Sequence, residues 1–88
     1  MNEIEKTFYN MDDVKRRAFK AYFKRFGEYA AQPSSDVDFF EIAGKNYVVL
    51  SNVNGILAVY RIYNDGRLKF LKKYPKEISE QYQPIGKT

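Results

Sequence analysis

The sequence of 88 residues contains no cysteine, no histidine and no tryptophan, and only five glycines and three prolines. Without cysteine and histidine there can be no disulfide, no thiolate or imidazole metal ligand, no cysteine nucleophile and no histidine general base. The glycines are spaced as separate turns rather than as a phosphate-binding loop, and no serine stands in a nucleophile-elbow pattern. We therefore expect no enzyme, no cofactor and no bound metal.

The acidic residues offer one weak candidate for a metal site. Asp36 and Asp38 alternate along a predicted strand, so that both carboxylates lie on one face, and Glu41 follows nearby. Two carboxylates could bind Mg²⁺, but the spacing fixes no third ligand. A capping or turn role for Asp36 is the more ordinary interpretation.

Long hydrophobic runs are also absent. The longest apolar stretches, residues 47–50 and 56–60, have the length of a strand and fall far short of the ~20 residues that span a bilayer. The first residues have neither the basic nor the apolar segment of a signal peptide. We expect a cytoplasmic protein of one domain, with a flexible arm over residues 1–9, no membrane contact and no small-molecule substrate.

Aromatic side chains are abundant, with eight tyrosines and seven phenylalanines. Together with other apolar residues they recur at helical spacing after Asn10, which suits an N-cap because acidic residues follow it in the first turn. Pro33 must end the helix, and Gly27 could end it earlier. The pattern predicts a helix over residues 10–32.

From residue 37 onward the apolar period changes from about 3.6 residues to about 2, which indicates strands. Turn signals separate four predicted strands, at residues 37–42, 47–52, 56–63 and 67–74. The expected fold is α+β, with one N-terminal helix packed on a four-stranded antiparallel meander over residues 36–74. The C-terminal segment, residues 75–88, could form a short helix.

The turns also predict which strand residues share a face. We expect two-residue loops at Gly44-Lys45 and Asn54-Gly55, and a three-residue loop at residues 64–66. These loops place one apolar set together on a single face of the sheet. That set comprises Phe40, Ile42, Tyr47, Val49, Ser51, Ala58, Tyr60, Ile62, Leu68 and Phe70. We expect the helix to cover this face.

The opposite face of the sheet has no helix to cover it in this scheme. Its apolar members are Val37, Phe39, Val48, Leu50, Leu57, Val59 and Leu71. A patch of this size usually marks an interaction surface, and the C-terminal segment offers only Ile78, Tyr82 and Ile85 as cover. We expect a small binding or regulatory module that contacts a protein partner, or a second copy of itself in a homodimer, through these residues.

Positive charge concentrates in the last third of the chain and supports an alternative. Residues 61–88 hold seven basic and three acidic side chains, and basic residues are interleaved with aromatic ones. Such a surface could bind anions, of which nucleic acid is the commonest large one. The candidate contacts are Arg61, Tyr63, Arg67, Lys69, Lys73 and Lys76. Lysines that keep an edge strand soluble would give the same pattern.

The strand pattern of residues 57–71 resembles the last strands of RelE/ParE-type toxins, which are small basic proteins with a Tyr-Arg hairpin pattern. In those toxins a basic, tyrosine-bearing sheet cleaves or contacts RNA, or binds a gyrase-type target. The resemblance implies a toxin-like ribonuclease as a third interpretation. It does not extend to the leading strand or the paired helices of those toxins, and no catalytic residue is carried over from them.

Overall fold

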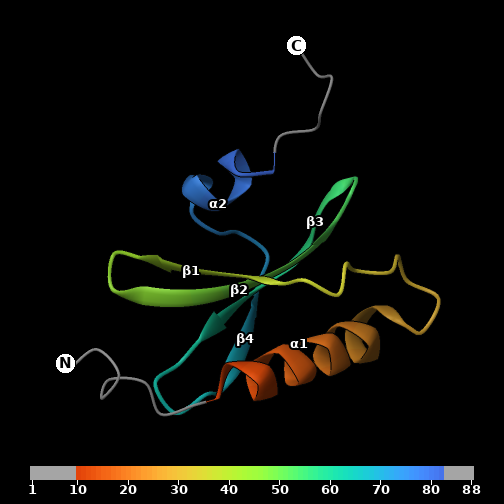
Figure 1. Ribbon diagram of the computed structural model, residues 1–88, viewed down its shortest axis with the longest axis horizontal. Helices are drawn as coiled ribbons and strands as arrows, with labels where there is room; N and C mark the ends of the chain where they lie inside the picture. The colour runs from red at the N-terminus through yellow and green to blue at the C-terminus, as the bar shows by residue number, and fades with distance from the viewer. Residues whose placement is uncertain (1–9, 83–88) are drawn as a thin grey trace.

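The computed structural model describes residues 10–82 and contains one long helix, a four-stranded antiparallel sheet and one short helix (Figure 1). The elements are α1 (Met11–Phe26), β1 (Asp38–Ile42), β2 (Lys45–Asn52), β3 (Gly55–Ile62), β4 (Leu68–Leu71) and α2 (Lys76–Glu80). The strands lie side by side in chain order, and the two helices lie on opposite faces of the sheet. The predicted α+β meander with a short C-terminal helix is confirmed. The predicted arm over residues 1–9 and the end of the C-terminal segment lie outside the described residues.

Helix α1 begins where predicted but ends earlier. The Asn10 side-chain oxygen accepts a 3.0 Å hydrogen bond from the Asp13 N–H, as an N-cap does. Gly27 follows the helix with φ +94°, and its N–H donates to the Phe23 carbonyl at 2.8 Å. A side chain at this φ would be strained, so glycine lets the chain leave the helix axis here. The helix predicted over residues 10–32 is therefore too long at its C-terminal end.

The turn between β1 and β2 is displaced from its predicted position without a change of face. Ile42 pairs with Lys45 around Ala43 and Gly44, whereas the predicted loop was Gly44-Lys45. Both loop residues have positive φ, as the type I′ turn of a tight hairpin requires. Because this displacement changes the pairing by an even number of residues, β1 and β2 still share the predicted faces.

The turn between β2 and β3 is displaced in the same way. Gly55 pairs with Asn52, so the loop starts one residue earlier than predicted. The Asn52 side-chain oxygen accepts a 2.8 Å hydrogen bond from the Asn54 N–H, which closes the turn at this position. The side chain of Val53 consequently lies at the hairpin tip, where it is almost fully exposed.

A β-bulge in β3 then exchanges the faces of β2 relative to β3. Ser51 pairs with Ile56 but Leu50 pairs with Ala58, so Leu57 has no partner on β2. Since successive strand side chains point to opposite faces, one extra residue turns β2 over relative to the part of β3 beyond the bulge. The predicted grouping of β2 with β3 was therefore wrong.

The β3–β4 connection has the predicted register. The Tyr63 N–H donates to the Arg67 carbonyl at 2.9 Å, and Gly66 has φ +92° in the three-residue loop between them. Strand β4 nevertheless ends at Leu71, because the chain turns away from the sheet to reach α2. The strand predicted over residues 67–74 is too long by its last three residues.

Helix α1 packs on one face of the sheet and forms the first core. Its side chains Val14, Ala18 and Tyr22 are buried, and the Tyr22 hydroxyl donates to the Ala31 carbonyl at 2.7 Å. That hydrogen bond fixes the segment that follows the helix. The sheet contributes the buried residues Val48, Leu50, Ala58, Tyr60 and Ile62.

Helix α2 covers part of the other face and forms the second core. Ile78 has no exposed surface and packs with the buried Tyr47, Val49 and Val59. The rim of this core consists of Phe40, Ile42, Ile56, Leu71, Tyr74 and Tyr82. A helix of only five residues suffices because tyrosines on both sides of it extend the cover.

The expected uncovered apolar face is not present. Of its seven members, Val48, Leu50 and Val59 have no exposed surface, whereas Val37, Phe39 and Leu57 pack against the first core and Leu71 against the second. The bulge moves part of this set under α1. The C-terminal segment covers the rest with more aromatic surface than its apolar residues alone suggested.

Candidate functional site

Helix α2 leaves one end of its sheet face open, and that end is basic. Beside the residues under α2, the register aligns Tyr47 with Arg61 and Arg61 with Lys69. The side chain of Tyr47 is buried, whereas Arg61 is partly exposed and Lys69 is exposed. We define the basic surface by its five members, which are Lys45, Arg61, Tyr63, Arg67 and Lys69.

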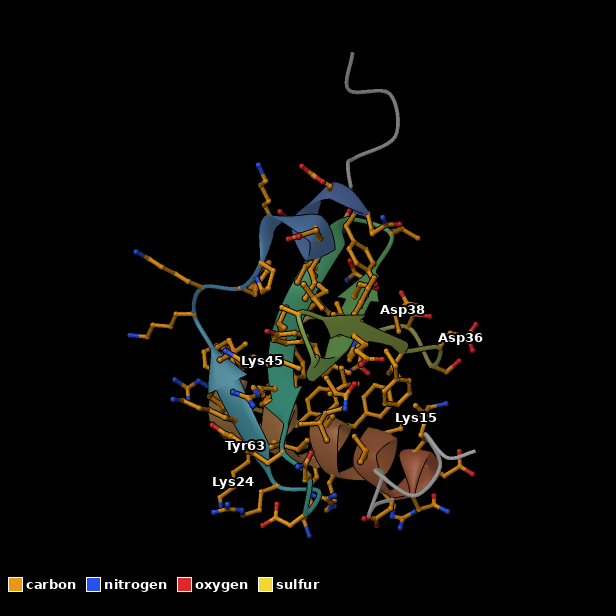
Figure 2. The ribbon with its side chains drawn as sticks, turned by 90° about the vertical axis from the view of Figure 1, so that its left-hand side faces the viewer. Lys15, Lys24, Asp36, Asp38, Lys45 and Tyr63 are labelled. Carbon is orange, nitrogen blue, oxygen red and sulfur yellow. The ribbon has the colours of Figure 1, made fainter. Side chains whose placement is uncertain are left out.

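The basic surface is separated from the acidic residues at the start of the sheet. Lys45 and Tyr63 lie on the β4 side of the molecule, whereas Asp36 and Asp38 lie on the opposite side (Figure 2). The register that pairs Asn46 with Ile62 places Lys45 next to Tyr63. A negatively charged ligand therefore meets cations from three strands on this side, with few competing carboxylates.

Tyr63 organises two arginines of the basic surface. The guanidinium carbon of Arg61 lies 4.7 Å from the centroid of the Tyr63 ring, and that of Arg67 lies 5.5 Å from it. Both distances are within the range of cation–π attraction. Because the Tyr63 backbone N–H is bonded to the Arg67 carbonyl just after β3, the two guanidinium groups are positioned before any ligand binds.

Arg61 and Lys69 form a pair of like charges across neighbouring strands. Directly opposed like charges destabilise a sheet. The Nε of Arg61 is buried and has no hydrogen-bond partner, and within residues 10–82 no carboxylate lies within ion-pair distance of Arg61. A buried donor without a partner costs about 1–3 kcal/mol. An anion that bridged the two cations would offset the repulsion between them.

Arg67 is held by the β3–β4 loop. Its Nε lies 2.8 Å from Asp65 Oδ2, and its backbone N–H donates to Asp65 Oδ1 at 3.0 Å. The Arg67 backbone hydrogen bond, helped by the guanidinium charge, lowers the pKa of the Asp65 carboxyl from its ordinary value. Since both side chains are largely exposed, this pair orients Arg67 more than it stabilises the fold.

The same loop is tied to α1 by a second arginine. The Arg17 guanidinium donates to the Gly66 carbonyl at 2.8 Å and, through Nε, to Asp13 Oδ2 at 2.8 Å. The hydrogen bond from Arg17 is the largest cause that lowers the pKa of Asp13. Arg17 therefore has a structural role and is not free to contact a ligand on the basic surface.

Arg25 is a cation that sequence patterns did not single out, and it lies on the α1 face of the sheet rather than in the basic surface. It lies near the end of α1, and its guanidinium carbon is 3.9 Å from the centroid of the Phe70 ring on β4. Phe70 in turn contacts Phe26 and Tyr60 edge-on. Contact between a helix end and an edge strand depends on tertiary packing, so spacing along the chain gave no signal for it. Lys45 was missed too, because the sequence placed it in a turn and gave it no basic neighbour, whereas it begins β2.

The predicted contacts are only partly brought together. Arg61, Tyr63, Arg67 and Lys69 form one surface, as the interleaving of basic and aromatic residues suggested. Lys73 lies on the linker after β4 and Lys76 at the start of α2, and both are exposed. These two lysines extend the positive edge without contacting Tyr63 in the described part of the chain.

The Asp38 carboxylate and the Asp36 backbone, at the start of the sheet, serve the fold. Asp38 accepts a short hydrogen bond from the Tyr82 hydroxyl, which links β1 to the residues after α2. Burial, followed by this contact with Asp38, raises the pKa of the Tyr82 phenol above its ordinary value. The turn before β1 is closed by Ser34, whose Oγ accepts from the Asp36 N–H at 3.2 Å. Among the residues described, no three acidic side chains gather where they could hold a metal ion.

Comparisons with known proteins give no family to which the chain can be assigned. No protein-family model, no curated protein and no solved structure matches it. Between residues 10 and 82, neither helix is long and apolar enough to cross a membrane. The function therefore has to be inferred from the chemistry of the surface itself.

Proposed function

We propose that the protein is a non-catalytic nucleic-acid-binding module whose basic surface holds the phosphate backbone. The observation that carries this proposal is the opposed pair Arg61 and Lys69 beside Tyr63. Anionic phosphate would relieve the repulsion between the two cations and would accept hydrogen bonds from the part of the Arg61 guanidinium that is exposed and from the Lys69 ammonium. Neither benefit is available from the carboxylates of the described residues.

A polymeric anion suits this surface better than a small one. Its cations come from three neighbouring strands, and same-face residues on a strand are about 6.6 Å apart. A chain of phosphates can contact several such positions at once, which a single small anion cannot do. The Tyr63 ring with its two arginines also offers a stacking platform for a base.

Burial of the apolar candidates weakens the alternative of a protein interface on the sheet. The residues expected to meet a partner lie in the two cores. The large hydrophobic side chains that are exposed in the described part of the chain are Met11, Phe26, Tyr29 and Val53. These lie at the ends of α1, in the loop after it and at a hairpin tip, so they form no continuous sheet face.

The proposal is tested by fluorescence anisotropy with a labelled single-stranded oligouridine and a labelled DNA duplex. We expect binding by the unchanged protein and a loss of roughly tenfold or more in the double variant Arg61→Gln with Lys69→Gln. The matched control, Lys15→Gln with Lys20→Gln on α1, removes the same charge from another surface and should bind nearly normally. Equal losses in the two double variants, or no binding by the unchanged protein, would contradict the proposal.

The same samples distinguish binding from cleavage. The oligouridine should remain intact after prolonged incubation with the protein, because residues 10–82 assemble no acid–base pair near the basic surface. If the unchanged protein shortens the RNA and the double variant does not, the toxin-like ribonuclease is favoured instead.

A further inference from the structure

Strand β3 is twice as long as the strand that covers its outer edge. Strand β4 pairs with Val59–Ile62, whereas Gly55–Ala58 have no partner on that side within residues 10–82. Leu57, the bulge residue, has no partner on β2 either. The Gly55–Ala58 segment, with Leu57 near its middle, therefore forms an open sheet edge to which a further strand can pair.

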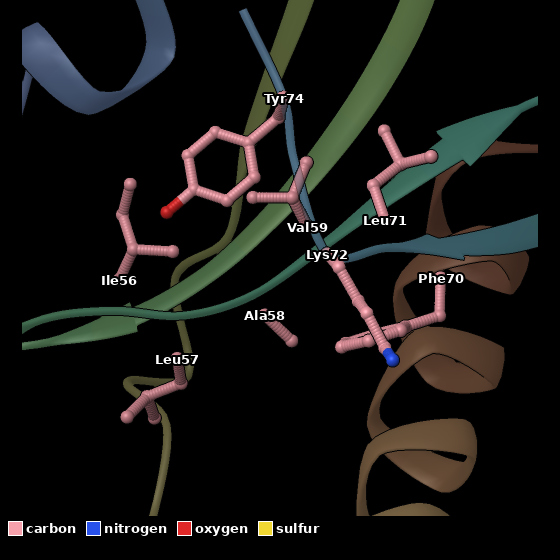
Figure 3. Close-up of a pocket in the computed structure, with 8 residues that line it drawn as sticks. All are labelled: Ile56, Leu57, Ala58, Val59, Phe70, Leu71, Lys72 and Tyr74. Carbon is pink, nitrogen blue, oxygen red and sulfur yellow. The ribbon is translucent and has the colours of Figure 1, made fainter. Parts of the chain in front are cut away.

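A groove of about 290 Å³ lies beside this open edge (Figure 3). It is lined by Ile56, Leu57, Ala58, Val59, Phe70, Leu71, Lys72 and Tyr74. The apolar lining comes from both cores: Leu57 and Phe70 pack against the first core, whereas Ile56 and Tyr74 pack against the second. The groove thus lies in the plane of the sheet between its two faces, where the missing part of β4 would run.

We propose that this groove binds an extended acidic peptide, which adds to β3 as a strand beyond the end of β4. The side chains of an extended peptide alternate, so apolar ones would meet the two walls of the groove in turn. The backbone of the peptide would pair with the open edge around Leu57. Lys72, which lines the groove, would attract a carboxylate of the peptide.

Charge decides between the possible occupants. A second copy of this chain paired edge to edge would bring a second Lys72 and Lys73 to the same contact and no compensating acidic group, whereas an acidic peptide supplies the opposite charge. Nucleic acid is also a poorer occupant, because apart from Lys72 the lining side chains carry no charge. An acidic peptide satisfies the open backbone, the apolar walls and the lysine together.

The test uses the full chain labelled with ¹⁵N and a blocked peptide that alternates valine with glutamate. We expect the peptide to shift the amide signals of Leu57 and its neighbours and to slow hydrogen exchange of the Leu57 amide. Lys72→Glu should weaken binding roughly fivefold, whereas the matched control Lys20→Glu on α1 should not. Both lysines are exposed, so neither change should unfold the protein.

Three comparison probes make the proposal refutable. A peptide with lysine in place of glutamate, and one with serine in place of valine, should both bind much more weakly. If the serine peptide binds as well as the valine peptide, charge alone attracts it and the strand-addition proposal is wrong. The proposal is also overturned if the valine–glutamate peptide leaves the Leu57 amide unchanged, or if oligouridine shifts that amide and the peptide does not.

Discussion

Arg61 and Lys69 lie directly opposite each other on β3 and β4, at the open end of the face that α2 partly covers. Two cations in this position cost stability, and a bridging anion would offset that cost. The Arg61 Nε, which has no hydrogen-bond partner, adds to that cost. Stability and binding should therefore change in opposite directions when this pair is altered.

Lys69→Glu should stabilise the protein while it weakens nucleic-acid binding. The substitution replaces a repulsion across the strands with an ion pair to Arg61, which we expect to raise the free energy of unfolding by about 0.5–1 kcal/mol. Urea unfolding measures the stability, and anisotropy with labelled oligouridine measures the affinity. Lys20→Glu, on the exposed side of α1, is the charge-matched control and should show neither effect. A less stable Lys69→Glu protein would contradict the role given to this pair.

Truncation of Ile78, the buried residue of α2, should lower the stability of the protein strongly. Ile78 has no exposed surface and is the buried contact of α2 with the sheet. Ile78→Ala should lower the free energy of unfolding by about 2–4 kcal/mol, since it removes buried methyl groups and leaves a cavity. The comparison is Glu80→Ala in the same helix, which is exposed and should change stability by less than about 0.5 kcal/mol. Similar values for the two variants would mean that α2 does not hold the second core together.

Two arginines that share one carboxylate should differ in importance. Arg16 and Arg17 both contact Asp13, but only Arg17 also donates to the Gly66 carbonyl in the β3–β4 loop. We expect Arg17→Ala to cost about 1–2 kcal/mol of stability and Arg16→Ala about 0.5 kcal/mol or less. Denaturant titrations of both variants give the comparison. Equal costs would show that the link to Gly66 contributes nothing.

The contact between Tyr82 and Asp38 predicts a loss of stability at alkaline pH. The pKa of Tyr82 is raised in the folded protein, chiefly by burial and then by Asp38. The contribution of this group is therefore complete below the ordinary tyrosine pKa of about 10 and is lost as the pH rises above it. In Tyr82→Phe the free energy of unfolding should fall less steeply above this pH than in the unchanged protein. Parallel curves for the two proteins would contradict the assignment.

Local signals in the sequence were enough to predict the elements and part of the site. The Asn10 cap, the loop that contains Gly66 and the interleaving of Arg61 with Tyr63 all depend on neighbours along the chain, and the structure shows each of them. The early end of α1 at Gly27 was foreseen as a possibility, although the helix was predicted to continue.

The features that the sequence did not predict have one physical origin: each depends on contacts between residues that are far apart in the chain. No residue type encodes the bulge at Leu57, yet this single unpaired residue reverses the faces of β2 against β3. The cover provided by Ile78 becomes visible only when α2 folds back on the sheet. The stacking of Arg25 on Phe70 likewise joins segments far apart in the chain. The exposed apolar face was therefore predicted for two reasons, the one-residue error in register and the unforeseen cover by the C-terminal segment.

The most direct test of nucleic-acid binding is the dependence of affinity on salt. The logarithm of the binding constant for oligouridine should fall linearly with the logarithm of salt concentration, with a slope of about −2 to −3 if the four cations of the basic surface contact phosphates. In the double variant Arg61→Gln with Lys69→Gln the slope should become shallower by about 1.4, because two of these contacts are lost. A slope near zero, or a slope that the double variant leaves unchanged, would show that the basic surface does not bind the phosphate backbone.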